Sequence, residues 1–500
     1  MDHLPIRRVV IVGGGTAGWM MGAAAARFLL DGRRTVTLVE SDEIGTIGVG
    51  EATIPPVLGF NRMLGIDEDA FIRATNGTYK LGIEFVGWRT GADRYFHPFG
   101  THGRSIEGLN FHQVWLKLRT DAGVGDLDGY SPSAVAAALG RFARPTGDPA
   151  APLAGLAYAY HFDAGLYAAF LRRRAEGSGV ERLEGRIVAV ERDDATGHVA
   201  RLRLDDGRVV EGDLFIDCSG FRSLLLGGAM QVPFESWRHW LPCDRAIAVP
   251  SARAGALPPY TRSTAHRAGW QWRIPLQHRT GNGIVYASEY LGDDDAERLL
   301  LGGLEEAPIA ASRRLAFTAG RRARLWEGNV VALGLAGGFL EPLESTSIHL
   351  IQEGISKLFA LFPDRRFAAV ERDQYNRLMG DAYRSIRDFI ILHYHATERT
   401  DSPFWRDMAA MTVPDTLAEK IALFREKGRI FRYDDELFSI PSWVAVMLGQ
   451  GIVPDGYDPV VDALDEDRLA SALPQLRQSI RRAVEGLPAH AALFPPQRSA

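Results

Sequence analysis

The stretch "VVIVGGGTAGWMM" (residues 9–21) constrains the fold of this chain more than any other feature. Strand-favouring residues precede three consecutive glycines, and a helical run follows to about Leu30. A second strand is predicted over 35–40, and it ends in Glu40. Glycines spaced as G-x-G-x-x-G permit a tight turn and a close backbone approach to a pyrophosphate, and an acid after the next strand can bind ribose hydroxyls. The pattern therefore predicts a βαβ dinucleotide-binding unit.

Most of the cofactor contacts expected from this unit lie at the first turn of its helix, where free N–H groups face the phosphates. They are Gly13, Gly15, Thr16, Ala17 and Gly18, and Glu40 joins them from the end of the second strand. Two later stretches predict returns of the chain to the nucleotide. The strand "GDLFIDCSG" (212–220) carries Asp217 near its end, and "GNVVALGLAGGFLE" (328–341) predicts a strand followed by a Gly-rich turn with Gly334 and Gly338.

Length and composition limit the class of protein. A chain of 500 residues predicts two domains or one large domain with insertions. The net charge is -5 with both signs spread along the chain, which argues against a nucleic-acid partner. Cys218 and Cys243 are the only cysteines, too few for a disulfide framework and consistent with a reducing cytoplasm. The apolar run 9–30 is broken by glycines, so we expect neither a signal peptide nor a membrane span.

The organisation of the chain predicts an α/β fold in which a Rossmann-like domain is interrupted by other segments. This layout resembles flavin monooxygenase-type enzymes, with an inserted β-rich substrate module and a mostly helical C-terminal region. The expected division is 1–55 (cofactor βαβ unit and strap), 56–155 (inserted substrate-side segment), 156–230 (return to the cofactor domain), 231–325 (β-rich module), 326–365 (cofactor-domain strand and helix) and 366–500 (helical cap). Within it, 131–155 is predicted as a loop, 161–176 as a helix and 245–320 as strands.

Lys80 lies in "TYKLGIEFV" (78–86), where alternation predicts one strand with Lys80 and Gly82 on the same face. A lysine in a strand is most simply a solvated charge. Lysine is nevertheless rare in this arginine-rich chain, occurring only at 80, 117, 357, 420 and 427. An amine can lose its proton and react, whereas a guanidinium cannot, so Lys80 is a candidate for chemistry.

Glu344 lies in "GFLEPLESTSIHL", where helical spacing predicts a helix that begins near Ser345 to Ser347. The carboxylate therefore precedes a helix N-terminus, whose dipole favours its ionised form. A capping role is the simplest interpretation. The same free N–H groups could hold a small anion such as a halide.

Two aromatic stretches complete the candidates. In "GWQWRIP" (269–275), Trp270, Trp272 and Ile274 would share one strand face, which by itself indicates an aromatic core strand. The three histidines of 97–112 match no familiar metal-ligand spacing, so we expect no metal site there. The functional interpretation of residues 97–112 is that their histidine and aromatic side chains line a pocket for a flat ring.

Taken together and in this order, these motifs resemble the flavin-dependent halogenases of the tryptophan/indole type, and the likeness covers most of the chain. The motifs that carry it are GGGTAGW (13–19), GVGEATIP (48–55), Lys80, HPFG (97–100), W-x-W-x-I-P (270–275) and PLEST (342–346). They resemble, respectively, the family's FAD motif, flavin strap, essential lysine, substrate loop, signature strand and the segment with the essential glutamate, here Glu344.

The resemblance implies a mechanism. Reduced FAD reacts with oxygen to give a flavin hydroperoxide, and chloride or bromide held near the Thr346 and Ser347 amides converts it to hypohalous acid. This acid travels through an internal tunnel to Lys80, whose amine hydrogen-bonds it or forms a haloamine. Glu344 polarises the electrophile or takes the proton from the ring intermediate as a general base.

The resemblance also implies further site residues and partners. For FAD these are the strap residues Gly48, Val49, Gly50, Glu51 and Ala52, with Val188 and Asp217. For the aromatic substrate they are His97, Pro98, Phe99 and Trp443, and for a tunnel wall that excludes the substrate from the flavin they are Trp270, Trp272, Ile274 and Pro275. A separate flavin reductase is implied, and homodimers are common in the family.

The segment 433–451, "YDDELFSIPSWVAVMLGQG", offers no match to the clamp that holds the ammonium and carboxylate of free tryptophan in tryptophan-specific members. We therefore expect indole or another electron-rich aromatic as the substrate class. A flavin-dependent aromatic monooxygenase and a non-catalytic flavin-binding protein are the alternatives.

Overall fold

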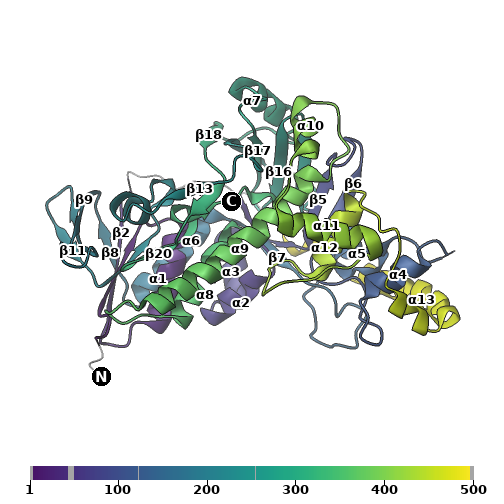
Figure 1. Ribbon diagram of the computed structural model, residues 1–500, viewed down its shortest axis with the longest axis horizontal. Coiled ribbons are helices and arrows are strands. Elements are labelled where there is room, and N and C mark those ends of the chain that lie inside the picture. The colour runs from purple at the N-terminus through teal and green to yellow at the C-terminus, as the bar shows by residue number, and fades with distance from the viewer. Residues whose placement is uncertain (1–3, 43–49, 122, 254, 496–500) are drawn as a thin grey trace.

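The computed structural model describes residues 4–42, 50–121, 123–253 and 255–495. A six-stranded sheet with the order β20-β21-β12-β1-β2-β8 forms one end of the molecule (Figure 1), and all neighbours in it are parallel except β20 and β21. Its strands are β1 (Arg8–Val12), β2 (Thr35–Glu40), β8 (Glu181–Glu184), β12 (Leu214–Asp217), β20 (Trp326–Glu327) and β21 (Val330–Ala332). Stretches of chain far apart in sequence thus build one sheet, which confirms the predicted interrupted Rossmann-like fold.

Three helices bring the cofactor motifs to this sheet. They are α1 (Thr16–Phe28), α6 (Ala164–Gly177) and α8 (Ser347–Ala360), and α1 packs against both of the others. The run of alanines and glycines in α1 leaves little side-chain bulk, so the neighbouring helices approach closely. Helix α1 begins three residues after Gly13, and α8 begins where the sequence predicts.

The second large element is a seven-stranded sheet ordered β18-β14-β17-β16-β15-β5-β6. Only β5 and β15 are parallel neighbours in it. Its strands are β5 (Gly82–Val86), β6 (Arg94–Pro98), β14 (Arg245–Ala252), β15 (Thr261–His266), β16 (Gly269–Pro275), β17 (Arg279–Tyr286) and β18 (Arg313–Ala316). The signature strand β16 lies between two partners, so both of its edges are paired.

The predicted single strand over 78–86 is wrong, because the chain changes sheets at Leu81. Strand β4 (Thr78–Lys80) pairs with β7 (Ala159–Asp163), which also pairs with β3 (Gly50–Ala52), whereas β5 belongs to the seven-stranded sheet. The backbone N–H of Leu81 donates to Pro259, and its carbonyl accepts from Phe99. These tertiary hydrogen bonds make the crossing, and alternation along the sequence carries no sign of them.

The C-terminal region is mostly helical, as predicted. Its longest helix, α9 (Ala369–His395), runs from the side of the six-stranded sheet toward α12 (Ile440–Gly449), and it contacts α8, α10 and α11 along the way (Figure 1). The other helices of this region are α10 (Pro403–Ala410), α11 (Asp415–Lys427) and α13 (Glu466–Glu485).

Three local predictions need correction. The segment 131–155 is not all loop, since it contains α5 (Pro132–Ala138), whose cap Ser131 accepts from the backbone of Ala134. The segment 245–320 contains helix α7 (Asp293–Gly302) between its strands. Residues 161–163 belong to β7, and the helix predicted over 161–176 begins only after its cap Asp163. The remaining elements are α2 (Pro56–Met63), α3 (Glu68–Thr75), α4 (Phe111–Leu118), β9 (Ile187–Arg192), β10 (Val199–Leu204), β11 (Val209–Glu211), β13 (Phe234–Ser236), β19 (Gly320–Arg322) and β22 (Gly338–Phe339).

Candidate active site

A cavity of about 450 Å³ opens at the carboxyl ends of β1 and β2 and extends to the face of the seven-stranded sheet. The cofactor residues predicted from sequence that line it are Gly13, Gly15, Thr16, Ala17, Glu40, Gly50, Glu51, Ala52, Gly334 and Gly338. They come from four separate segments of the chain. The six-stranded sheet and the crossing helices therefore bring together most of the predicted dinucleotide contacts.

The glycines of the first turn are required for two reasons: Gly13 and Gly18 pack against backbone atoms, and Gly15 leaves open space at the start of α1. Gly13 has a φ of +105°, and a Cβ there would lie 2.4 Å from the carbonyl oxygen of Cys218. A Cβ at Gly18 would lie 1.8 Å from the carbonyl oxygen of Gly13. Gly15 faces open space and provides no side-chain cap for α1, so the first N–H groups of that helix are free for a phosphate. This cradle fits the pyrophosphate of FAD.

Glu40 stands at the end of β2, where its carboxylate can accept from ribose hydroxyls. The Nε of Arg182 lies 2.5 Å from its Oε1, and Arg172 lies 3.6 Å away. The two guanidiniums fix the carboxylate at the cavity wall. The second acid of this wall is Glu51, whose pKa burial raises to about 7.

The other five predicted cofactor residues have different outcomes. Gly48 and Val49 lie outside the described residues. Val188 is not brought to the cavity: its side chain is 53% exposed, and its neighbours Arg186 and Ile187 line the cavity instead. Asp217 is fully buried behind the cavity, where its Oδ2 accepts from the backbones of Leu225 and Leu226. Gly18 supports the turn and does not line the cavity.

Lys80 is completely buried, contrary to the simplest interpretation of a strand lysine. Its Nζ donates to Ser345 Oγ at 2.8 Å and lies 5.1 Å from the centre of the Phe99 ring. Burial lowers the pKa of Lys80 to about 7, although the charge of Glu344 opposes this shift. Near neutral pH the amine is thus available in its uncharged, nucleophilic form.

Ser345 is the link between Lys80 and the dinucleotide cavity. It lines that cavity, and its backbone adopts the left-handed region with a φ of +59°. This conformation separates the short 3₁₀ turn Pro342–Glu344 from the start of α8. The amine of Lys80 is therefore separated from the cavity by the side chain of Ser345 alone.

Glu344 is also fully buried, and it lies between two imidazoles. The Nδ1 of His97 lies 2.9 Å from Oε2, and the Nε2 of His393 lies 2.8 Å from Oε1. Burial alone would raise the pKa of this carboxyl, but the His97 charge and the close approach of both imidazoles outweigh it and lower the pKa to about 2. Glu344 is therefore an anion within this buried site.

His393 is a site residue that the sequence analysis missed. It lies in the last turn of α9, in a stretch predicted only as helix. Its Nδ1 lies 2.8 Å from the hydroxyl of Tyr95, which orients the ring, and burial lowers its pKa. The sequence signal was a histidine among the apolar residues "FIILHYH" of a buried helix, which is most often a satisfied core histidine.

A cluster of aromatic rings begins at His97, on the side of Glu344 that this imidazole occupies. The centre of the His97 ring is 5.5 Å from that of Phe389, which stacks on Phe438 at 3.7 Å and meets Trp443 edge-on at 4.8 Å. Of the predicted substrate residues, His97, Phe99 and Trp443 thus lie near Lys80 or Glu344, and Pro98 is the buried end of β6 between the first two. The indole Nε1 of Trp443 has no hydrogen-bond partner among the described residues.

The predicted halide residues lie at the N-terminus of α8. Thr346 is fully buried, and its Oγ1 has no hydrogen-bond partner within the described part of the chain. Ser347 lines the cavity. The free N–H groups of this helix end and the unpartnered hydroxyl can accept an anion.

The two tryptophans of GWQWRIP have different positions. Trp272 lines the cavity together with Ile274, and its ring lies directly against Gly283 of β17, where a Cβ would come within 2.0 Å of it. Trp270 is buried behind it, and Pro275 is also buried and ends the strand; neither lines the cavity. Only part of the predicted wall therefore faces the cavity.

No group of three or more His, Cys, Asp or Glu side chains in the described ranges could hold a metal ion. No helix in that same part of the chain is both long and apolar enough to span a bilayer.

Comparisons with known proteins agree with this geometry. The family model of tryptophan halogenase matches residues 8–466. The chain is 36% identical over 515 residues to tryptophan 6-halogenase SttH of Streptomyces toxytricini, with 97% of each chain covered. It superposes on Xcc4156, a flavin-dependent halogenase from Xanthomonas campestris, with a TM-score of 0.95 and 49% identity over 99% of this chain and 100% of that one. For BrvH, a flavin-dependent halogenase from Brevundimonas sp. BAL3, the TM-score is 0.94 and the identity 47%, over 98% and 99% of the chains. The chain therefore belongs to the tryptophan halogenase family and is a flavin-dependent halogenase that uses FAD and a halide.

Proposed function

We propose that this halogenase acts on small, uncharged, electron-rich aromatics of the indole type, with Lys80 and Glu344 as its catalytic residues. The observation that carries the proposal is the position of Lys80. Its buried amine contacts Ser345, which lines the dinucleotide cavity, and Glu344 immediately precedes Ser345 in the chain. Reduced FAD, supplied by a separate reductase, would provide the oxidising chemistry that converts halide to hypohalous acid.

The residues of the chain would then divide the work. The α8 N-terminus with Thr346 and Ser347 would hold the halide, and Ser345 would mark the exit from the cavity. The Lys80 amine would capture the hypohalous acid, by a hydrogen bond or as a haloamine. Glu344 would stabilise the cationic ring and take its proton, as a base fixed by His97 and His393.

The substrate class is supported by the charges near the aromatic cluster. Lys420 lies 5.4 Å from the Trp443 ring, and its Nζ is already bound to Glu436 at 3.0 Å and to the Phe431 carbonyl at 2.6 Å. A cation so engaged is not free to bind a substrate carboxylate. The rings of Phe389, Phe438 and Trp443 instead fit an apolar, flat molecule.

The experiment is an assay with purified reductase and a panel of indoles, phenols and free tryptophan, with chloride or bromide, analysed by mass spectrometry. We expect halogenated indole-type products that require halide. Hydroxylated products that appear without halide would contradict the proposal. Faster turnover of free tryptophan than of indole would contradict the substrate class alone.

A cytoplasmic location accompanies the proposal, because reduced flavin is supplied there and the buried Cys218 and Cys243 are both free thiols. A homodimer is the oligomeric form to test first, by light scattering. We propose no nucleic-acid or membrane partner.

A further inference from the structure

A continuous row of buried aromatic rings leads away from the cavity. Trp272 lines the cavity, and its ring centre is 6.0 Å from that of Trp270. Trp270 is 6.5 Å from Trp88, and Trp88 is 5.4 Å from Tyr394. The last three side chains are at most 1% exposed. Electrons pass readily between rings this close, because tunnelling weakens with distance and a dry interior has little solvent to reorganise.

One carboxylate serves two members of this row. The Oε1 of Glu341 accepts from Trp270 Nε1 at 3.0 Å and from the Tyr394 hydroxyl at 2.5 Å, while its Oε2 has no partner among the described residues. Loss of an electron makes an indole N–H or a phenol O–H a far stronger acid, so the electron vacancy, or hole, settles where a base receives the proton. Burial raises the pKa of Glu341 to about 7 even though both hydrogen bonds oppose the rise, so the carboxylate can take a proton near neutral pH.

We infer that Trp272, Trp270, Trp88 and Tyr394 form an electron-transfer path that removes oxidising equivalents from the cavity when no substrate consumes them, with Glu341 as the proton acceptor. This inference rests on the proposed position of FAD in the cavity. It gives the signature strand a second function, besides forming a wall.

The chemistry balances in single-electron steps. Hypohalous acid that meets no substrate takes two electrons from the aromatic row and one proton from solvent, which gives halide and water. Trp272 gives each electron to the acid, and Tyr394 replaces it through the other rings of the row. As Tyr394 becomes a neutral tyrosyl radical, its O–H proton moves to Glu341. A small reductant such as ascorbate returns the electron, the proton goes back from Glu341 to the phenolate oxygen, and the path is ready for the second electron.

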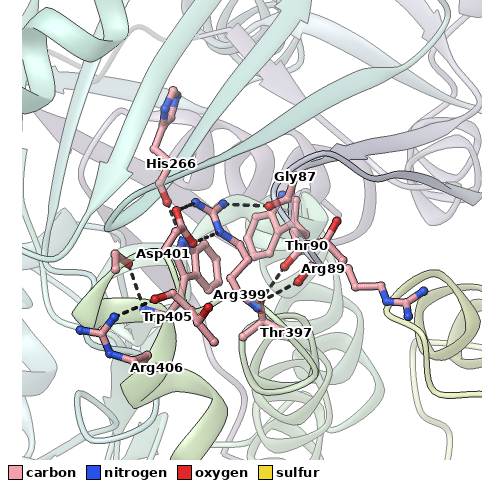
Figure 2. A network of polar contacts seen from close by, with 12 residues as sticks. Gly87, Arg89, Thr90, His266, Thr397, Arg399, Asp401, Trp405 and Arg406 are labelled. Carbon is pink, nitrogen blue, oxygen red and sulfur yellow. Dashed lines mark hydrogen bonds and ion pairs between the residues drawn. The ribbon is translucent and has the colours of Figure 1, made fainter.

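Arg399 defines the outer end of the path. Its guanidinium donates to the Gly87 carbonyl at 2.8 Å, pairs with Asp401 at 2.7 Å and lies 4.8 Å from the Trp405 ring (Figure 2). Trp405 stacks on Tyr394 at 5.9 Å. A fixed cation over an indole makes removal of an electron from it harder. The electron vacancy therefore rests on Tyr394. Trp405 connects Tyr394 to the side of the protein where Asp401 is 55% exposed.

The experiment uses light on the enzyme loaded with oxidised FAD, because an excited flavin takes one electron from a nearby indole without oxygen or halide. Transient absorption and electron paramagnetic resonance would follow the radical. We expect a long-lived tyrosyl signal in the wild type. Trp270→Phe should abolish it, since the gap interrupts the row, and Tyr394→Phe should leave only a short-lived tryptophan radical.

Glu341→Gln separates proton transfer from packing. The amide keeps the shape and can still accept a hydrogen bond, but it cannot take the proton, so the tyrosyl signal should be lost while FAD binding remains. Trp326→Phe is the matched control, because Trp326 is equally buried but packs on Tyr375, outside the row, and it should behave as the wild type. A tyrosyl signal that persists in Trp270→Phe overturns the inference, and so does its absence from FAD-loaded wild type. If FAD does not bind at all, the proposed function fails as well, and flavin fluorescence distinguishes that result.

Discussion

The Nζ of Lys80 donates to the Oγ of Ser345 at 2.8 Å, and this hydrogen bond joins two segments that are 265 residues apart. It connects strand β4 with the turn that begins α8. Because Ser345 lines the dinucleotide cavity and Glu344 precedes it, one contact relates the proposed origin of the oxidant to both proposed catalytic residues. The first predictions concern these residues.

Lys80→Met should abolish halogenation while FAD binding and flavin oxidation continue. Methionine fills a similar volume in the buried site but has no amine to capture hypohalous acid. Product analysis by mass spectrometry, alongside oxygen consumption, measures the two activities separately. Lys357→Met is the control, because Lys357 lies on α8 in a partly exposed pair with Glu353. Halogenation by the Lys80 variant at the wild-type rate would remove Lys80 from the mechanism.

The halogenation rate should rise as pH increases through about 7, the pKa to which burial lowers Lys80. The sign follows from the reactive form: a haloamine forms from the neutral amine, which predominates above that pKa. Single-turnover rates over the neutral range give the profile. Dissolved hypohalous acid with the same aromatic corrects for the acid's own ionisation. A rate that falls across this range would instead favour hydrogen bonding by the protonated amine.

Glu344→Gln should lower the halogenation rate by roughly 10²–10⁴-fold, the usual range for loss of a general base. The amide keeps the contacts to His97 and His393 in part but cannot carry the charge. Steady-state rates with bromide would measure the effect, and thermal unfolding would check that the variant is folded. Glu353→Gln, on the partly exposed side of α8, should change neither. An active Glu344 variant would limit this residue to a capping role.

Two glycines of the first turn should respond differently to substitution by alanine, one through the stability of the fold and the other through the affinity for FAD. Gly18→Ala should destabilise the fold, because its Cβ would lie 1.8 Å from the Gly13 carbonyl oxygen. Gly15→Ala meets no atom within 4 Å, so the protein should fold normally but bind FAD more weakly, since the methyl group enters the phosphate cradle. Thermal unfolding without cofactor and FAD titration distinguish the two. Unchanged affinity in Gly15→Ala would place the pyrophosphate elsewhere.

Trp272→Ala tests the wall between the organic substrate and the flavin. Because Trp272 lines the cavity and Trp270 does not, the single change at 272 should admit the aromatic to the cavity and produce hydroxylated product. Halogenation should continue at a reduced rate. Trp270→Ala is the comparison, and it should lower stability by roughly 3–5 kcal/mol without new product. A Trp272 variant with no oxygenation would show that the wall is not the barrier.

The sequence predicted the parts of the fold that have local causes. The G-x-G-x-x-G turn requires glycines wherever it occurs, and Gly13 and Gly18 show why: their Cβ positions would collide with backbone atoms. Helix α8 and its cap region follow from hydrophobic spacing. The regular alternation of GWQWRIP likewise gave a strand with the predicted face.

What could not be predicted depends on contacts distant in sequence. Alternation over 78–86 carries no sign that Leu81 bonds to Pro259 and Phe99, so the change of sheet was missed. The burial of Lys80 follows from that crossing. His393 shows the same limit, because only the folded chain places the last turn of α9 against Glu344.

The crossing at Leu81 has a mechanical consequence. Lys80 is the last residue of one sheet, and two residues later the chain enters another, whose next strand ends with His97 and Pro98. The amine is thus held in the three-stranded sheet, directly before the β5–β6 hairpin of the seven-stranded sheet, whose second strand carries His97 beside the proposed general base. If a residue inserted at this junction shifted β4 by one position against β7, Lys80 would turn to the other face of its sheet. The distance between the Lys80 amine and the His97 ring therefore depends on the number of residues at this junction. Engineering of the substrate pocket has most freedom in the helices and least in the segment from Lys80 to His97.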